Sequence, residues 1–349
     1  MAGPRRRPRQ AGTRRRRLGP ICFRCPDLPQ KQTRREKSHI KSHTLRQKIF
    51  MPYNIFSDLP RIAAALHDEP WLILPSHHRS MVEQIAAHRS QPQAYRPGRS
   101  SSQDEAPPVG YVNAITSYDK ASGLAVIDVK GAIGKGLSSM ATSCGGFDLN
   151  TLEDGLARLA DIKPRAVQMY FNTPGGTVTG IEEASAAIEE FSMMTAPIHA
   201  YSDALCCSAG EWLAASASSR TAAPSTILGS IGVYSARFDE SAMYAKEGVK
   251  VHLIASGPDK GAGYPGTEIS ADHLAKTREE VMALAGEFFA HMSHRQALLG
   301  RAPLDPAVHF TGATFRAKSP AGALLHDGLV PSRQAHLRQL AALYTPRRR

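Results

Sequence analysis

Cysteine is scarce in this chain, and its pattern does not suit a disulfide framework. The 349 residues include five cysteines, an odd number, and two of them, Cys206 and Cys207, are adjacent. Folds that depend on disulfides carry cysteines more densely and in even numbers. The pattern therefore excludes a disulfide-stapled scaffold and favours a reducing compartment, so we expect a cytoplasmic protein.

Long apolar runs are also missing. No stretch is apolar over the roughly 20 residues that a membrane-spanning helix needs. The basic N-terminal residues are not followed by the apolar segment of a signal peptide. We therefore expect no membrane association. Apolar residues still make up 42% of the chain, which suffices for a core in one large domain or two small ones.

Charge is unevenly distributed. Residues 1–50 contain 16 Lys and Arg against 2 Asp and Glu, whereas the remainder contains 27 against 29. The body is nearly neutral, which gives no reason to predict a nucleic-acid interface there. Residues 1–50 have the composition of a basic disordered tail. Because Met51 opens a different composition, a second interpretation is that residues 1–50 are not translated. Nucleic-acid binding is expected only if the tail is real.

The tail contains one pattern of metal ligands. Cys22, Cys25, His39 and His43 have the spacing of a zinc finger. Prolines follow the second cysteine, and the apolar residues that form the core of a finger are missing. A chance match is therefore favoured over zinc, and we expect neither a metal nor a cofactor.

The rest of the chain divides into three parts. Residues 51–109 combine an N-terminal helical segment with a linker that is rich in Gln, Pro, Ser and Arg. Residues 110–335 form the main domain, and residues 336–349 a basic C-terminal tail.

The main domain alternates strand and helix patterns, which is typical of an α/β protein with parallel strands. Ser270 is a suitable N-cap for a long helix that runs toward Gly300. The predicted strands are 124–129, 166–171, 198–201, 219–225 and 249–254, and the predicted helices include 181–191 and 209–217.

Ser208 is the strongest candidate for a catalytic residue. It follows a predicted strand and begins a predicted helix, where backbone N–H groups and the helix dipole favour negative charge. A serine here can be a nucleophile or simply the N-cap of the helix. Taken alone, a serine in this position is more often a cap.

Two other motifs supply further parts of a hydrolase site. Gly175 and Gly176 follow a strand, and without side chains their N–H groups can form an oxyanion hole, although a tight turn has the same pattern. Lys260 lies in a glycine-rich loop. A lysine that loses its proton can activate a serine, although most lysines are solvated surface residues.

Other nucleophiles and bases fit less well. A Ser-His-Asp triad would need a histidine near Ser208, and His199 and His252 lie on predicted strands where a structural role is more common. Cys206 and Cys207 could be nucleophiles, but small apolar residues before a helix usually belong to the core. A serine and a lysine remain the favoured pair.

The motifs of this chain, in their order, resemble the signal-peptide-peptidase-A-like serine peptidases, peptidase family S49. The similarity is greatest to the phage and prophage members that process capsid or scaffold proteins. It covers roughly residues 110–335 and rests on four motifs: Asn172–Gly176, Cys207–Trp212, Gly229–Val233 and Ser256–Lys260.

The resemblance implies a ClpP/crotonase-like fold, a repeated ββα spiral, here with a long C-terminal helical region. It also implies residue roles: Ser208 as nucleophile, Lys260 as general base, Gly176 with Gly175 and Ala209 as backbone donors, and Ser230 as the residue that orients the lysine. Two positions depart from the family pattern, because Thr173 replaces a serine and Ala209 replaces a glycine.

The resemblance further implies a protein or peptide substrate and a homo-oligomeric ring, in which the serine and the lysine can come from neighbouring subunits. In the phage branch the partners would be capsid, portal or scaffold proteins, in the host cytoplasm or the procapsid. Three rivals remain open: a cytosolic protease of general peptides, a crotonase-type acyl-CoA enzyme with Glu211 as its acid or base, and a capsid scaffold protein without turnover.

Overall fold

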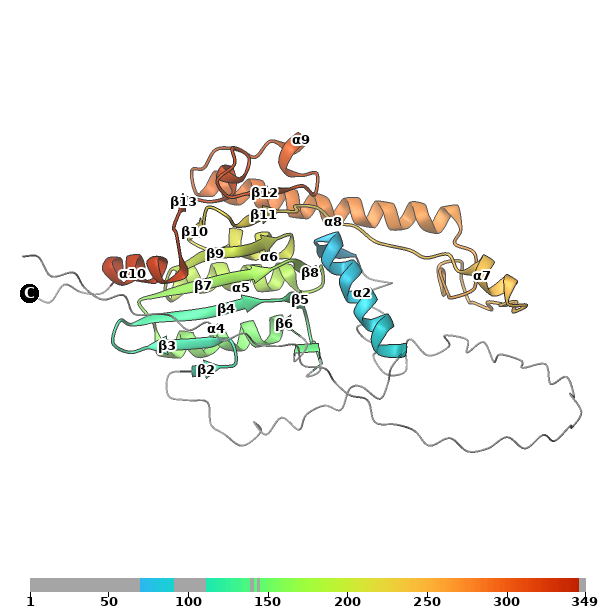
Figure 1. Ribbon diagram of the computed structural model, residues 1–349, viewed down its shortest axis with the longest axis horizontal. Coiled ribbons are helices and arrows are strands. Elements are labelled where there is room, and N and C mark those ends of the chain that lie inside the picture. The colour runs from blue at the N-terminus through green and yellow to red at the C-terminus, as the bar shows by residue number, and fades with distance from the viewer. Residues whose placement is uncertain (1–69, 91–110, 139–140, 143–144, 345–349) are drawn as a thin grey trace, which may run out of the picture. The chain divides into compact units, whose positions relative to one another are not determined.

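The computed structural model describes residues 70–90, 111–138, 141–142 and 145–344 (Figure 1). All of them belong to the unit Pro52–Arg349. The basic tail, its zinc-finger-like ligands and the linker lie outside the described residues.

The larger sheet is built around three parallel strands, β4, β7 and β9, in the order β12-β11-β9-β7-β4-β3-β2. Their apolar sequences suit strands that are covered on both faces. β10 pairs with β9 and β13, and only β2, β3 and β12 run antiparallel to their neighbours. The bounds are β2 Tyr111–Asn113, β3 Thr116–Asp119, β4 Leu124–Lys130, β7 Ala166–Thr173, β9 Ile198–Cys207, β10 Ser219–Ala222, β11 Ile227–Gly229, β12 Thr314–Arg316 and β13 Gly328–Leu329.

A smaller, four-stranded sheet has the order β1-β8-β5-β6. Its strands are β1 Trp71–Ile73, β5 Ala132–Gly134, β6 Gly146–Asp148 and β8 Gly175–Thr177. Two of them directly continue strands of the larger sheet: β5 follows β4 at Gly131, and β8 follows β7 at Pro174. Gly131 allows the first change of sheet, because its φ is 90° and a Cβ there would lie 1.7 Å from the Gly145 carbonyl oxygen.

A helix completes each of these units, so the pattern of two strands and a helix repeats, with one additional strand, β6, in the first unit. β4 and β5 are followed by β6 and α4, and β7 and β8 by α5, which confirms the predicted ββα spiral and the α/β class. The helices are α2 Pro75–Ser90, α4 Leu149–Ile162, α5 Ile181–Met194, α6 Ala209–Ala215, α7 Ser241–Lys246, α8 Ala271–Leu298, α9 Pro306–His309 and α10 Arg333–Tyr344, with a 3₁₀ turn at Gly322–Leu325.

Helix α6 lies at the centre of the hydrophobic core. All seven of its residues are buried, and its N-terminus follows β9 after a single residue, Ser208. Trp212 of α6 stacks on Phe288 of α8, with 4.7 Å between the ring centroids. The core therefore holds the end of β9 and the start of α6 in a fixed relation to one another.

The long helix α8 begins where the sequence predicts. Ser270 is its N-cap, and the Ser270 Oγ accepts a hydrogen bond from the His273 N–H. The first half of the helix, residues 271–284, contains no buried residue, and Leu274 is 47% exposed.

The structure differs from the sequence prediction at three places. Residues 249–254 form no strand, and Ile254 is 96% exposed, because no neighbouring strand in the described chain pairs with them. Residues 333–344, assigned largely to a basic tail, form α10, because Leu340 packs against Leu124 and Ala166. β1 lies before the predicted start of the main domain yet pairs with β8.

Among the helices of the described residues, none combines the length and the apolar character needed to cross a membrane.

Candidate active site

Ser208 occupies a strained turn between β9 and α6. Its φ of 55° and ψ of −116° are rare for a residue with a side chain, and such conformations persist only where the surroundings enforce them. Here the Ser208 N–H donates to the Gly229 carbonyl oxygen (2.8 Å), and the Trp212 N–H donates to the Ser208 carbonyl oxygen (3.1 Å).

The Ser208 hydroxyl does not cap helix α6. No hydrogen bond joins it to the first turn, and within the described residues its buried Oγ has no hydrogen-bond partner. A capping serine would satisfy one of the unpaired N–H groups of the helix. The capping role is therefore wrong, and the hydroxyl is held in the turn without a structural task.

Gly175 and Gly176 belong to β8, and both lie beside Ser208. The Ser208 Cβ is 2.9 Å from the point where a Cβ on Gly175 would stand, and the φ of Gly175 is 106°. A Cβ on Gly176 would lie 1.9 Å from the Ile133 carbonyl oxygen. Only glycine fits both positions, so the backbone can approach Ser208 closely.

Thr173 braces this glycine loop. Its hydroxyl donates to the Gly131 carbonyl oxygen (2.6 Å) and accepts from the Gly175 N–H (3.1 Å). The sequence indicated Thr173 only as a departure from a family pattern, and its contact with Gly131, 42 residues away, had no local signal. The Gly175 N–H already donates to Thr173. Of the three predicted backbone donors, Gly176 and Ala209 therefore remain as candidates for the oxyanion hole.

Ala209 and Ser230 lie next to the same turn. Ala209 follows Ser208 directly and is fully buried. Ser230 follows Gly229, whose carbonyl oxygen accepts the Ser208 N–H, and it is 5% exposed. Its φ of 56° is also strained, and its N–H donates to the Ala313 carbonyl oxygen (2.7 Å). The structure thus brings together every predicted site residue except one.

That exception is Lys260. It is exposed in the segment between α7 and α8, and its neighbour Asp259 forms an ion pair with Lys276 of α8 (2.8 Å). Phe288, which stacks on α6, lies twelve residues after Lys276 along α8. This spacing corresponds to roughly 18 Å at the rise of an α-helix. Figure 1 shows the segment beside α7, at the end of α8 away from α6. Lys260 therefore stands apart from Ser208 of its own chain.

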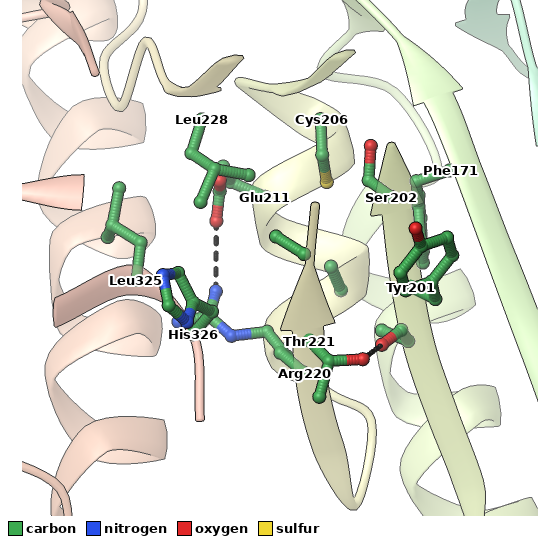
Figure 2. Close-up of a pocket in the computed structure, with 13 residues that line it drawn as sticks. Phe171, Tyr201, Ser202, Cys206, Glu211, Arg220, Thr221, Leu228, Leu325 and His326 are labelled. Carbon is green, nitrogen blue, oxygen red and sulfur yellow. Dashed lines mark hydrogen bonds and ion pairs between the residues drawn. The ribbon is translucent and has the colours of Figure 1, made fainter. Parts of the chain in front are cut away.

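A buried ion pair lies next to the turn that contains Ser208. Arg220 Nη1 donates to Glu211 Oε2 (2.9 Å), and the two side chains are 4% and 1% exposed. Figure 2 shows them facing each other at one side of a small cavity of about 20 Å³. The Gly229 N–H donates to Glu211 Oε1 (3.1 Å). Burial raises the pKa of the Glu211 carboxyl to about 7, against the opposing effects of Arg220 and the Gly229 N–H.

This arrangement disfavours the acyl-CoA rival. Both carboxylate oxygens of Glu211 are engaged, and the adjacent cavity has room for about one water molecule. No substrate can reach the carboxyl group there. The sequence identified Glu211 but contained no signal for its partner Arg220.

The structure also shows the surroundings of the alternative nucleophiles and bases. Cys206 and Cys207 are buried free thiols, and burial raises the pKa of both, so they stay protonated. His199 bonds to the Ser219 hydroxyl and the Tyr344 hydroxyl through its two ring nitrogens (2.7 and 2.9 Å), and His252 is exposed. Neither histidine contacts Ser208. Among the described residues, no group of His, Cys, Asp and Glu side chains could hold a metal ion.

Comparison with known proteins identifies relatives of the chain. Peptidase family S49 matches residues 190–304. Capsid assembly protease C of Escherichia phage lambda is 26% identical over 293 residues, and head-tail preconnector protein GP5 of Enterobacteria phage P21 is 28% identical over 292 residues. Each alignment covers 80% of this chain, which spans 64% and 56% of those two relatives. Protease 4 of Salmonella typhi is 31% identical over 119 residues, which are 34% of this chain and 19% of that protein.

Solved structures similar to the chain include a ClpP1 variant from Listeria monocytogenes and the ClpP catalytic domain from Plasmodium falciparum. Their sequence identities are 10% and 11%, and their TM-scores are 0.36 and 0.35. Each covers 60% of this chain, which corresponds to 93% and 86% of the respective structure. Residues 190–304, a stretch that includes Ser208 and Lys260, therefore resemble peptidase family S49, and most of the chain is similar to the two phage proteins.

Proposed function

We propose that the protein is a serine endopeptidase whose nucleophile is Ser208. The observation that carries the proposal is the turn itself: a strained, buried serine with an unpartnered hydroxyl, beside glycines that no other residue can replace. Strain of this kind is typical of functional positions. A hydroxyl held in this way can attack a carbonyl group without first breaking a hydrogen bond.

The general base in this proposal is Lys260 of a second copy of the chain. Within one chain Lys260 stands apart from Ser208, so a dyad requires the lysine to come from elsewhere. The segment that carries Lys260 also exposes large apolar side chains, among them Leu253 (45%), Ile254 (96%) and Tyr264 (52%). Exposed apolar clusters of this kind mark interaction surfaces. A second copy that covered this segment would also desolvate Lys260, which favours the neutral form that a base requires.

The reaction then proceeds by acyl transfer. Neutral Lys260 takes the proton from Ser208 as its Oγ attacks the scissile carbonyl group, and the N–H groups of Gly176 and Ala209 stabilise the oxyanion. Lys260 returns the proton to the leaving amine, and water hydrolyses the acyl-enzyme. Ser230, next to the turn, orients the lysine.

The proposed substrates are structural proteins of a phage or prophage particle, such as capsid or scaffold proteins. This part of the proposal is supported by the names of the two phage relatives, a capsid assembly protease and a head-tail preconnector protein. A general peptide substrate is the alternative, and it would be indicated by hydrolysis of unrelated unfolded proteins at comparable rates.

Mixing two inactive variants tests the shared site. Ser208→Ala and Lys260→Ala should each abolish peptide hydrolysis, whereas the mixture should regain activity, because one copy supplies the serine and the other the lysine. Lys250→Ala, on the same exposed segment, is the matched control and should stay active. A fluorophosphonate probe should label the wild-type chain but not Ser208→Ala. Full activity of Ser208→Ala would disprove the nucleophile, and a mixture that stays inactive would disprove the shared dyad.

A further inference from the structure

The short strand β1 occupies an unusual place beside the nucleophile. It pairs antiparallel with β8, so that Leu72 lies opposite Gly176 and Ile73 opposite Gly175. The Leu74 N–H extends this pairing by donating to the Pro174 carbonyl oxygen (2.9 Å). β1 therefore covers the edge of the glycine strand that faces Ser208.

The other edge of β1 is also paired. The Trp71 N–H donates to the Tyr234 carbonyl oxygen (2.7 Å), and the Tyr234 N–H donates to the Trp71 carbonyl oxygen (3.1 Å). Tyr234 belongs to the segment that continues from Ser230. β1 thus lies between the two backbone segments, β8 and the segment around Tyr234, that flank the nucleophile.

The backbone of β1 comes close to Ser208. The Leu72 carbonyl oxygen and the Ile73 Cα lie 2.0 and 3.0 Å from the point where a Cβ on Gly175 would stand, and the Ser208 Cβ lies 2.9 Å from that same point. The peptide group between Leu72 and Ile73 is therefore next to the nucleophile.

The side chains of β1 alternate between two apolar environments. Leu72 is fully buried in the main hydrophobic core, whereas Trp71 and Ile73 pack in a separate cluster with Tyr234. His78 at the start of α2 closes that cluster, because its ring lies 4.8 Å from the Trp71 ring and its Nδ1 is 2.8 Å from the Tyr234 hydroxyl. Backbone and side chains together hold β1 as a bound peptide would be held.

We propose that Trp71–Leu74 is an intramolecular occupant of the peptide-binding groove, and that it must leave before a substrate binds. The inference rests on the proposed peptidase function. An extended peptide is recognised by adding a strand to an exposed sheet edge, with pockets for alternate side chains. Both edges that flank Ser208 are satisfied by β1 here. The preferred substrate segment is accordingly an extended strand with large apolar residues at successive positions, such as the sequence Trp-Leu-Ile-Leu itself.

A reversible cross-link tests this occupancy in the full chain. Trp71 and Tyr234 form a hydrogen-bonded antiparallel pair, in which Cα atoms lie about 5.5 Å apart, a separation that suits a disulfide. The double variant Trp71→Cys/Tyr234→Cys should lose about tenfold or more of its hydrolysis rate on oxidation, because only the open fraction binds substrate. Reduction should restore the rate. The two single variants and the wild-type chain, oxidised in the same way, are the controls for the native cysteines.

A binding measurement keeps this inference separate from the catalytic proposal. In the Ser208→Ala background, the peptide Ac-Trp-Leu-Ile-Leu-NH₂ should bind to the reduced double variant and not to the oxidised one. Replacing both leucines of the peptide by aspartate should abolish binding. If the oxidised protein binds or hydrolyses peptides as well as the reduced protein, β1 is an ordinary structural strand and the inference is overturned. If peptide binding follows the proposal but nothing is hydrolysed, the peptidase function fails and the occupancy stands.

Discussion

Single residues outside the proposed catalytic set determine the geometry of the turn at Ser208. Ser208 is held by the Gly229 carbonyl oxygen, and the N–H group of Gly229 is held by Glu211. Glu211 in turn faces Arg220, so a chain of contacts leads from a buried ion pair to the strained serine. Each of these contacts joins residues that are not adjacent in the sequence.

Removing one partner of the buried pair should therefore be costly. Glu211→Ala leaves the Arg220 charge buried without a partner, and breaking a buried pair in this way costs about 3–5 kcal/mol. Urea unfolding at pH 8 measures the loss. The matched control is Glu153→Ala, which breaks the exposed ion pair with Lys135 (2.8 Å) and should cost less than about 1 kcal/mol. Equal losses for the two variants would contradict the argument.

At the scale of elements, α8 holds the C-terminal end of helix α6. Arg295 of α8 donates to three consecutive carbonyl oxygens at that end, those of Ala215, Ser216 and Ala217 (2.9, 3.2 and 3.3 Å). The last carbonyl groups of a helix have no partner within the helix, so a buried helix end needs donors of this kind. The second half of α8 thereby positions the turn at the opposite end of α6.

Arg295→Ala should destabilise the protein by about 2–4 kcal/mol, because hydrogen bonds from a charged donor to buried carbonyl groups are lost together. Chemical unfolding of the full chain measures the effect. Arg278→Ala is the control on the same helix, since Arg278 is exposed and its loss should change stability by less than about 0.5 kcal/mol. The bracing role would be ruled out if both variants unfolded at the denaturant concentration of the wild type.

At the scale of the whole molecule, two neutral histidines lie where peripheral helices meet the core. His291 of α8 stacks on Trp212, with 5.4 Å between the ring centroids, and His336 of α10 stacks on Tyr201 (5.1 Å). Burial lowers the pKa of each histidine to about 4, from an ordinary value of 6.5. Both contacts therefore favour the uncharged ring.

Stability should consequently fall as the pH drops from about 6.5 to about 4. In this range the unfolded chain binds protons at both histidines and the folded chain does not, so protonation favours unfolding by up to about 3 kcal/mol for each group. Denaturant unfolding at several pH values measures the slope. His336→Gln should reduce the slope, and His252→Gln, which changes an exposed histidine, should not. Identical slopes for His336→Gln and the wild type would refute this assignment.

The sequence by itself determined most of the framework and much of the candidate site. The strands at 124–129 and 166–171, the helix after Ser208 and the N-cap at Ser270 follow from apolar runs and capping residues, which act over a few positions. The turn at Gly175 and Gly176 has a local signature too, because glycine tolerates backbone conformations that a Cβ disfavours, whereas the role of these glycines beside the serine was implied only by the family resemblance. These are local preferences, and the structure retains them.

Only the tertiary structure decided which distant segments meet. No local pattern predicts that Arg220 neutralises Glu211, that β1 covers the glycine strand, or that Lys260 stands apart from Ser208 in its own chain. Residues 249–254 have the composition of a strand but form none, because a strand requires a neighbour to accept and donate its hydrogen bonds. Pairing of this kind depends on the geometry of the whole fold, so it is not encoded in the neighbourhood of any one residue.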